Sequence, residues 1–528
     1  MNNPFSLLKS KAAILSLGLL LSGVFASTHG DAGEPAILTP AATRTPRING
    51  PKIFGVRPGA PFFFSIPVTG DRPMQFSSDW LPPGLHLDAD TGVITGKLDQ
   101  KGEYQVVLHA GNSLGRADRH FKIIVGEKIG LTPVMGWNNF NLTGVRIDQK
   151  TILAAAHAMV DSGLAQHGWS YCNTDDGWQG LRGGDLNAIQ PGNDFPDIAA
   201  MVKEIHGLGL KAGIYSSPWV TTYGRHVGGS SEDSSGKWDA SLAAKNNNDH
   251  SQKLPFAIGR YHFAEQDARQ FALWGFDYLK YDWAPIHADA TREMHDALRA
   301  TGRDIIFSLS NNGLYTLLKE IRDVSQYANS WRTTDDVHNN WQNVSNSAFN
   351  QDPWASYAES GRFNDPDMLV IGVVGWGKPH PTHLTPDEQY TQISMWCLLS
   401  APLLLGCDLQ KLDPFTLSLI TNDEVLDIDQ DSMGMQATCI STNGGCNVYA
   451  KPLEDGSWAV GLINRGKDSA TATLKWEDLK LTGSYRVRDL WRQKDLGDFN
   501  GEFSSQVAPH GIVLIRVIPP AKTKSEMQ

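Results

Sequence analysis

The sequence has no block of Lys and Arg residues and no long hydrophobic run beyond its first 26 residues. Without a basic block, nucleic acid is not expected as a partner, and a net charge of −11 spread along the chain agrees with this. Without a second hydrophobic run, no membrane span is expected. The histidines form no H-x-H or HExxH pair, and the chain has neither a zinc-type Cys/His spacing nor a phosphate loop. We therefore expect no metal and no cofactor.

Cysteine is scarce, with five residues in 528. Cys439 and Cys446 flank a segment with an Asn-Gly-Gly turn signal, so we expect a hairpin closed by a Cys439–Cys446 disulfide. The other three cysteines lie in hydrophobic surroundings and are expected as buried thiols. They are Cys172, Cys397 and Cys407.

The first residues predict a secretory signal peptide, residues 1–26. Lys9 and Lys11 give the positive region, the hydrophobic stretch Ala12–Phe25 follows, and a small-residue cleavage site precedes Ser27. The hydrophobic stretch is too short for a membrane span. The mature protein is expected to be secreted or periplasmic.

The remaining length and an apolar content of 41% predict two or three globular domains. Residues 27–127 read as a linker followed by short alternating strands, which predicts an N-terminal immunoglobulin-like β-sandwich. This module could bind sugar, but nothing in it marks a specific site, so a spacer is the simpler interpretation. Residues 434–520 predict a C-terminal antiparallel β-sandwich, and residues 521–528 a polar tail.

Residues 128–433 alternate strand and helix, which predicts an α/β domain, a (β/α)8 TIM barrel. The eight expected strands lie within residues Pro133–Trp137, Ser170–Asp176, Lys211–Tyr215, Phe276–Tyr281, Asp304–Ser310, Asn329–Thr334, Asp367–Ile371 and Pro402–Gly406. The third connection, Ser216–Arg260, is far longer than the others and rich in Ser, Gly and Asn. It is expected to form a rim or lid over the site.

The fourth strand ends on a carboxylate, Asp282, at the end of the barrel where catalytic groups gather. Lys280 lies two residues earlier, on the same face of the strand. Asp282 is therefore a candidate nucleophile with a cation beside it, or an ordinary cap of the next helix.

Carboxylates also end the second and sixth expected strands and border the seventh. They are Asp175, Asp176, Asp335, Asp336, Asp365 and Asp367, with Arg332 as a further cation. Like charges repel when they converge on one rim unless a ligand or cations compensate them. Such a rim suits a neutral polyhydroxylated ligand, and two carboxylates can hydrolyse a glycosidic bond. The 16 Trp residues could stack on sugar rings or simply fill the core.

A set of motifs occurs in order along the barrel. They are Met135–Asn139, Asp175–Gln179, Gly209–Tyr215, Leu279–Asp282, Trp331–Asp336, Asn364–Leu369, Leu384–Tyr390 and Ser400–Gly406. Together they resemble the secreted α-galactosidases and α-N-acetylgalactosaminidases of glycoside hydrolase family 27, in the melibiase clan. The N-terminal segment from Leu81 to Gly96 resembles the immunoglobulin-like modules attached to secreted bacterial enzymes.

The resemblance implies a retaining double displacement with Asp282 as nucleophile and Asp336 as acid/base. A retaining pair is expected to have its carboxyl groups about 5–5.5 Å apart. Asp282 must be ionised to attack, and Lys280 favours that form. Asp336 must first be protonated, and we expect a charged neighbour such as Asp335 to raise its pKa.

The resemblance also implies contacts with a galactose-containing glycan. Asp175 and Asp176 match the pair that holds the 4- and 6-hydroxyls. The other matching substrate-binding positions are Trp137, Tyr215, Lys280, Ser310, Arg332 and Asp367.

Three departures from the family pattern concern the walls of the site. Phe140 stands where a second Trp is common, Asp335 replaces a Gly, and the Cys-stapled loop after the third strand is absent. Ser310 lies where the family contacts the sugar 2-substituent, and it leaves the choice between galactose and N-acetylgalactosamine open.

The expected function is therefore an exo-acting α-galactosidase. The alternatives within the family are α-N-acetylgalactosaminidase, β-L-arabinopyranosidase and isomalto-dextranase. A non-catalytic sugar-binding protein is a further alternative, disfavoured because both candidate catalytic carboxylates are present. A homo-oligomer is left open.

Overall fold

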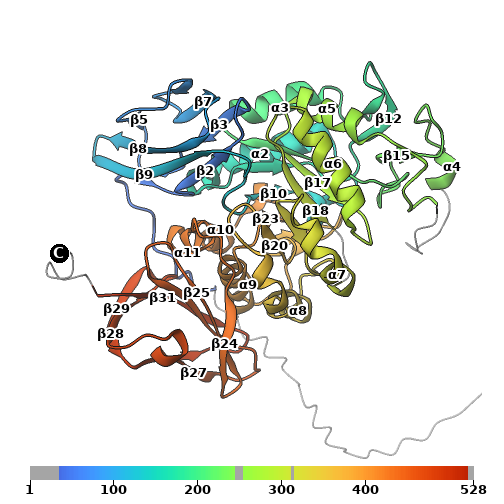
Figure 1. The fold of residues 1–528 in the computed structure, drawn as a ribbon. Coiled ribbons are helices and arrows are strands. Elements are labelled where there is room, and N and C mark those ends of the chain that lie inside the picture. Colours follow the sequence, from blue (N-terminus) through green and yellow to red (C-terminus); the bar gives the residue numbers. More distant parts are fainter. Residues whose placement is uncertain (1–34, 244–253, 311–313, 521–528) are drawn as a thin grey trace, which may run out of the picture. The chain divides into compact units, whose positions relative to one another are not determined.

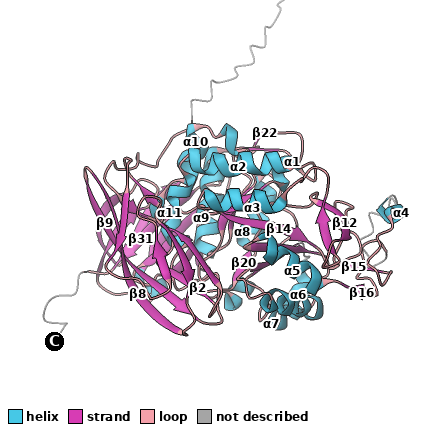
Figure 2. Ribbon diagram, turned by 90° about the horizontal axis from the view of Figure 1, so that it is seen from above, coloured by secondary structure: helices cyan, strands magenta, loops and turns pink. Residues whose placement is uncertain are grey.

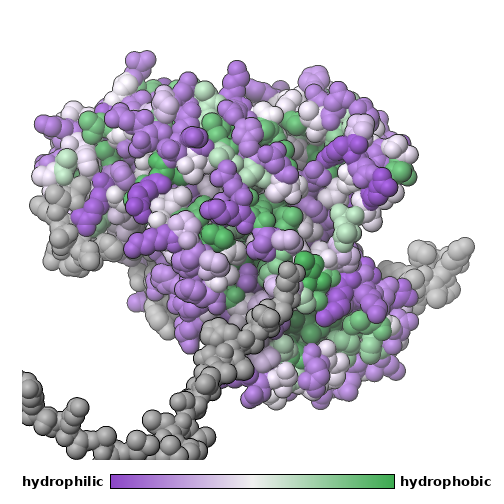
Figure 3. Space-filling view, turned by 180° about the vertical axis from the view of Figure 1, so that it is seen from behind, coloured by the Kyte–Doolittle hydropathy of each residue, from purple (hydrophilic) through white to green (hydrophobic). Residues whose placement is uncertain are grey.

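The computed structural model describes residues 35–243, 254–310 and 314–520. The expected signal peptide, residues 1–26, and the polar tail, residues 521–528, lie outside the described residues. Within the described part, no helix is long and apolar enough to cross a membrane. The face shown in Figure 3 carries mostly hydrophilic side chains, with hydrophobic ones in separate groups.

The central sheet has eight parallel strands in the order β20-β19-β18-β17-β14-β11-β10-β23 (Figure 1). They are β10 (Met135–Asn138), β11 (Tyr171–Asn173), β14 (Lys211–Ser216), β17 (Tyr278–Asp282), β18 (Ile306–Ser310), β19 (Ser330–Arg332), β20 (Phe363–Asp365) and β23 (Leu403–Leu405). An isolated parallel bridge from Leu369 to Leu405 joins the two ends of the sheet. The predicted TIM-barrel fold class is confirmed.

Helices cover the outside of the barrel strands, whereas the two sandwiches are almost wholly strand and loop (Figure 2). The helices are α1 (Phe140–Thr143), α2 (Gln149–Asp161), α3 (Ile198–Gly207), α4 (Ala240–Ala243), α5 (Ala264–Trp274), α6 (Ala288–Ala300), α7 (Leu314–Val324), α8 (Trp341–Phe349), α9 (Pro386–Leu399), α10 (Pro414–Ile420) and α11 (Asp423–Asp429). In α2, Ile152, Ala156 and Met159 share one buried face at helical spacing. Asp148 caps this helix by accepting a hydrogen bond from the Thr151 amide.

Short elements complete the connections of the barrel. They are η1 (Leu164–His167), η2 (Asp352–Tyr357), η3 (Leu409–Lys411), β12 (Gln179–Gly183), β13 (Ala188–Pro191), β15 (Ser230–Ser231), β16 (Tyr261–His262), β21 (Val373–Val374) and β22 (His380–Pro381). Most of the small hairpins follow strands that carry candidate site residues.

The seventh strand differs from its prediction. It is β20, and the expected segment Asp367–Ile371 follows it instead of forming it. Asp367 has a φ of 81°, in the left-handed region, so the chain turns there and cannot continue the ladder. The sixth strand likewise ends at Arg332, which leaves Asp336 in the loop beyond it.

The N-terminal sandwich consists of two main sheets and a short strand pair. The strands are β1 (Arg47–Ile48) with β4 (Val68–Thr69); β2 (Ile53–Val56), β9 (Gly115–Val125), β8 (Gly102–Asn112) and β5 (Gln75–Ser78); and β3 (Pro61–Ser65), β7 (Val93–Lys97) and β6 (Leu85–Leu87). Phe121, Ile123 and Val125 on β9 alternate with more exposed residues, because successive side chains of a strand point to opposite faces. Their buried face forms the core between the sheets.

The C-terminal sandwich is antiparallel. One sheet holds β24 (Thr438–Asn443), β25 (Cys446–Pro452), β26 (Trp458–Asn464), β31 (Ile512–Ile518), β28 (Ser484–Asp489) and β29 (Lys494–Asn500), and the other holds β27 (Ala470–Lys475) and β30 (Glu502–Val507). The short helix η4 (Trp476–Leu479) follows β27.

The expected Cys439–Cys446 disulfide is wrong, because all five cysteines are free. The hairpin between them does form, but its register pairs Asn443 with Cys446 and Cys439 with Tyr449. The two cysteines are thus about 10 Å apart along the strands, beyond the Cα separation that a disulfide spans. Cys446 also lies in the core of the sandwich, whereas Cys439 packs on the barrel core.

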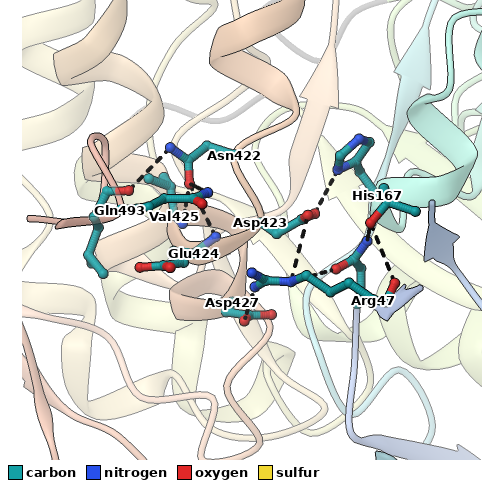
Figure 4. A network of polar contacts seen from close by, with 12 residues as sticks. Arg47, His167, Asn422, Asp423, Glu424, Val425, Asp427 and Gln493 are labelled. Atoms are coloured by element: carbon teal, nitrogen blue, oxygen red, sulfur yellow. Dashed lines mark hydrogen bonds and ion pairs between the residues drawn. The ribbon is translucent and has the colours of Figure 1, made fainter. Parts of the chain in front are cut away.

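Charged side chains join the first strand of the chain to the barrel (Figure 4). Arg47 of β1 lies 3.2 Å from Asp427 and 3.8 Å from Asp423, both on α11. Asp423 also pairs with Nδ1 of His167 at 2.6 Å. The N-terminal sandwich, η1 and α11 therefore share one polar junction.

Asn422, which is fully buried, fastens α11 to the C-terminal sandwich. Its Oδ1 caps the helix by accepting from the amides of Glu424 and Val425. Its Nδ2 donates to the carbonyls of Leu490, at 3.2 Å, and Trp491, at 3.0 Å.

We expect Asn422→Ala to destabilise the protein by ~2–4 kcal/mol, because it leaves buried amides and carbonyls without partners. Calorimetric melting should show a Tm lower by about 2–4 °C. Asn422→Asp keeps the capping oxygens and loses the donor, so its Tm should fall between those of the wild type and Asn422→Ala. A Tm unchanged in both variants would contradict this role.

Candidate functional site

The C-terminal ends of the barrel strands bring the predicted residues to one rim, because parallel strands end at the same side of a barrel. The residues at or just beyond these ends are Trp137, Asp175, Asp176, Tyr215, Lys280, Asp282, Ser310, Arg332, Asp336 and Asp367. Asp282 pairs in register with Ser310 on β18, and Lys280 pairs with Tyr215 on β14.

Asp282 is the last residue of β17 and is 6% exposed. Its Oδ2 accepts a hydrogen bond from the Tyr215 hydroxyl at 2.9 Å. Its Oδ1 is buried and has no hydrogen-bond partner among the described residues. One oxygen is therefore held in place while the other is open to react.

Burial raises the pKa of Asp282 to about 7. The positive charge of Lys280 lowers this pKa, and the negative charges of Asp175 and Asp336 raise it further. Lys280 favours the ionised form of Asp282, as we expected, but its attraction is smaller than the effect of burial. The loss of hydration outweighs the attraction because Asp282 lies beneath the surface, where an ionised carboxylate is poorly solvated.

Asp336 lies in a more open place, with 57% of its side chain exposed. Its Oδ1 accepts a hydrogen bond from Nη2 of Arg332 at 3.1 Å. Partial burial works to raise the pKa of Asp336, but the charges of Arg332 and Lys280 outweigh it and lower that pKa. The prediction that Asp335 raises the pKa of Asp336 is therefore wrong, because the adjacent guanidinium dominates.

Arg332 also binds Asp367, whose Oδ2 lies 3.0 Å from Nη2 of the guanidinium. The carboxylate of Asp367 further accepts hydrogen bonds from the amides of Val337 and Met368. Arg332 is 4% exposed, so this pair is shielded from water. It fixes the loop that carries Asp336 to the segment after β20.

Lys280 forms the second ion pair of the rim. Its Nζ lies 2.8 Å from Oδ2 of Asp175, and that oxygen also accepts from Nδ2 of Asn138 at 2.7 Å. Burial alone would lower the pKa of Lys280, but the charges of Asp175 and Asp282 raise it, so Lys280 stays protonated.

Asp176 is held by three residues of the long third connection, Ser216–Arg260, that the sequence analysis did not name individually. Its oxygens accept from the hydroxyl of Thr222, the amide of Gly224 and Nδ1 of His226. The only signal in the sequence was the length of the insertion after the third strand. Within that insertion, residues 244–253 lie outside the described part of the chain.

The remaining predicted contacts line the same rim. Trp137 is 1% exposed, and its indole N–H donates to the carbonyl of Cys407 at 2.8 Å. The ring of Phe140 lies 5.5 Å from Nζ of Lys280. Ser310 Oγ accepts from Nη1 of Arg332 at 3.5 Å. In the described residues, no group of three or more His, Cys, Asp or Glu side chains could hold a metal ion.

Three family models match parts of the chain. Residues 248–431 match the family described as "Alpha galactosidase A", and residues 443–517 match "Alpha galactosidase C-terminal beta sandwich domain". Residues 45–126 match "Putative Ig domain".

Individual relatives carry the same family name. Alpha-galactosidase 2 of Arabidopsis thaliana is 36% identical over 397 residues, which cover 74% of this chain and 90% of that protein. The chain belongs to the α-galactosidase family, glycoside hydrolase family 27. Another member, Alpha-galactosidase A of Cellvibrio japonicus, is 31% identical, covering 74% of this chain and 93% of its own.

Solved structures extend the likeness within the family. A "putative alpha-galactosidase" from Bacteroides fragilis superimposes with a TM-score of 0.78 at 31% identity, covering 93% of this chain and 99% of its own. Alpha-galactosidase I of Mortierella vinacea has a TM-score of 0.62 at 29% identity, covering 75% of this chain and 99% of its own.

We expect Asp282→Asn to stabilise the fold. An aspartate with a folded-state pKa above its unfolded value costs stability above the folded pKa, and this cost vanishes below the unfolded pKa. The gain in the free energy of unfolding, seen as a higher Tm of the variant, should therefore grow between about pH 4 and about pH 7 and then level off. This gain in free energy has an upper bound of ~4 kcal/mol. Asp335→Asn, at an exposed neighbour of Asp336, is the control and should show no such gain. Equal Tm values for Asp282→Asn and wild type at about pH 8 would refute the burial argument.

Proposed function

We propose that the protein is a retaining exo-glycosidase that hydrolyses terminal α-D-galactosyl residues of oligosaccharides or polysaccharides. Family membership supports the hydrolase class. The observation that carries the mechanism is the state of Asp282, with one oxygen held by Tyr215 and the other buried and without a partner among the described residues. That is how a nucleophile is presented to a single reacting atom.

In the first step, the open oxygen of Asp282 bonds to the anomeric carbon while the bond from that carbon to the leaving oxygen breaks. Asp336 donates its proton to the leaving oxygen, so the aglycone departs as an alcohol. In the second step, Asp336 takes a proton from water, and the water oxygen displaces Asp282. Two inversions leave the configuration of the sugar unchanged.

The surroundings of the two carboxylates suit these two roles. Asp282 lies deep, where burial makes its ionised form reactive. Asp336 lies at the open edge, where an aglycone and then water can reach it. Arg332 holds Asp336 in place through a hydrogen bond that is available while Asp336 is ionised.

The sugar contacts that we propose follow the family pattern. Asp175 and Asp176 lie on the 4- and 6-hydroxyl side, with Lys280 beside them. Trp137, Tyr215, Ser310, Arg332 and Asp367 complete the pocket.

The catalytic assignment predicts large losses on substitution. Asp282→Asn and Asp336→Asn should each lower kcat on an aryl α-galactoside by roughly 10³-fold or more, whereas Asp335→Asn should retain most activity. Wild-type enzyme should release the α-anomer of galactose first, as followed by proton NMR. The assay should include an aryl α-N-acetylgalactosaminide and an aryl β-L-arabinopyranoside. Turnover of none of the three would end the exo-glycosidase proposal.

The pH dependence of kcat/KM should reflect one proton that Asp282 and Asp336 share. The productive form has Asp282 ionised and Asp336 protonated, which is the less populated arrangement, since burial raises the pKa of Asp282 to about 7 and Arg332 lowers that of Asp336. Loss of the shared proton should make kcat/KM fall above about pH 7. Asp335→Asn should leave this limb in place. A profile flat to about pH 9 would contradict the shared proton.

We further propose that the protein is exported, as a secreted or periplasmic enzyme, on the basis of the leader pattern in residues 1–26. N-terminal sequencing of protein recovered outside the cytoplasm should begin at Ser27.

A further inference from the structure

A small hairpin, residues 221–227, lies in the insertion that follows β14. An antiparallel bridge pairs Thr221 with Val227. The amide of Thr222 donates to the carbonyl of His226, and the amide of Arg225 donates to the carbonyl of Thr222, both at 2.9 Å. These bonds close a tight tip at residues 223–225.

The tip is fastened to the end of the second barrel strand through Asp176. Oδ1 of Asp176 accepts from Thr222 Oγ1 and from His226 Nδ1, each at 3.0 Å. Oδ2 accepts from the amide of Gly224 at 2.6 Å. Asp176 is 1% exposed, so the three donors enclose it.

Gly224 is required for this close approach. A Cβ at Gly224 would lie 2.7 Å from Asp176 Oδ2 and 2.7 Å from Cγ1 of Val145. Any larger residue would push the hairpin off the carboxylate.

The base of the hairpin is fastened separately. Arg182 and Asp267 form an ion pair with side chains 1% and 0% exposed, and Nη2 of Arg182 donates to the carbonyl of Gly228 at 2.9 Å. The guanidinium also lies 4.3 Å from the ring centre of Phe263. Arg182 thus holds the base of the hairpin, and Asp176 holds the part at and next to its tip.

The tip carries Tyr223 toward the catalytic pair. Its ring packs 4.8 Å from Trp219 and 6.2 Å from Phe256, centre to centre. Burial raises the pKa of Tyr223, and the charges of Asp282 and Asp336 raise it further. The charges of both carboxylates therefore act on this phenol.

We infer that Asp176, besides its proposed contact with the sugar, clamps the hairpin 221–227, and that the clamped tip with Tyr223 is a specificity-determining wall of the sugar pocket. This inference deepens the proposed function and rests on it. Because the hairpin grips Asp176, its tip borders the side of the pocket assigned to the 4- and 6-hydroxyls. The clamp then sets the fit to the exocyclic C6 group that galactose has and L-arabinopyranose lacks.

The test removes the donors and leaves Asp176 in place. Thr222→Val deletes the hydrogen bond that Thr222 Oγ1 donates to Asp176 and the one that it accepts from the His226 amide. His226→Phe deletes the bond from His226 Nδ1 to Asp176. Thr222→Ser and His226→Gln keep a donor. Free D-galactose and free L-arabinose serve as competitive inhibitors of aryl α-galactoside hydrolysis. We expect the Ki of galactose to rise about tenfold in the deleting variants, with that of arabinose changed less than about twofold. The donor-keeping variants should retain wild-type values.

A double-mutant cycle with Asp176→Asn shows whether Thr222 acts through that carboxylate. Thr222→Val should have little further effect on the Ki of galactose in the Asp176→Asn background. Full additivity, or equal changes for both sugars, would overturn the inference.

Hydrogen exchange of the peptide covering residues 221–227 separates this inference from the proposed function, because it needs no substrate. Exchange should be faster in Thr222→Val and His226→Phe than in wild type, and unchanged in a peptide from β17. If wild-type enzyme hydrolyses none of the sugars, the proposed function fails while faster exchange still supports the clamp. Unchanged exchange overturns the clamp whatever the activity.

Discussion

The charge balance at the barrel rim constrains the rest of the site. Five aspartates lie there 1–6% exposed, namely Asp175, Asp176, Asp282, Asp365 and Asp367. Two of them are paired with cations, Asp175 with Lys280 and Asp367 with Arg332. Like charges at such depth are tolerated only when each is paired, hydrogen-bonded or protonated. Asp282 is left with the weakest compensation, and burial accordingly raises its pKa to about 7.

This unequal distribution separates the two proposed catalytic carboxylates. Asp336 shares Arg332 with Asp367, keeps contact with water and has a lowered pKa. Among the described residues Asp282 forms no direct ion pair, and its Oδ2 accepts a hydrogen bond from the hydroxyl of Tyr215. The barrel thereby buries Asp282, whose ionised form is poorly solvated, more deeply than Asp336, which is well solvated. A sugar that enters between them would meet a nucleophile at the bottom of the pocket and a proton donor at its mouth.

Much of this arrangement follows from the sequence. Strand-end position alone predicted that Asp282, Asp175 and Arg332 would converge, because all parallel strands end at one rim. Two-residue periodicity placed Lys280 on the same face as Asp282. The fold class could also be predicted, since eight alternations of strand and helix have few other solutions.

Other features depend on three-dimensional detail that residue order does not encode. The balance between burial and attraction that sets the pKa of Asp282 depends on depth, and the pKa of Asp336 depends on a guanidinium 3.1 Å away. Hairpin register excluded the Cys439–Cys446 disulfide even though the turn was correctly located. The left-handed backbone at Asp367 begins the hydrophobic segment that was expected as the seventh strand, and that segment follows β20 instead of forming it.

The central claim is that Asp282 forms a covalent bond to the sugar. An α-galactoside with fluorine at C2 and an activated aryl leaving group tests it, because fluorine destabilises the cationic transition state and slows release of the glycosyl-enzyme. Peptide mass spectrometry after incubation should find the fluorosugar attached once, to the β17 peptide, at Asp282. Attachment at another carboxylate, or release of the aryl group without any attached sugar, would contradict the account.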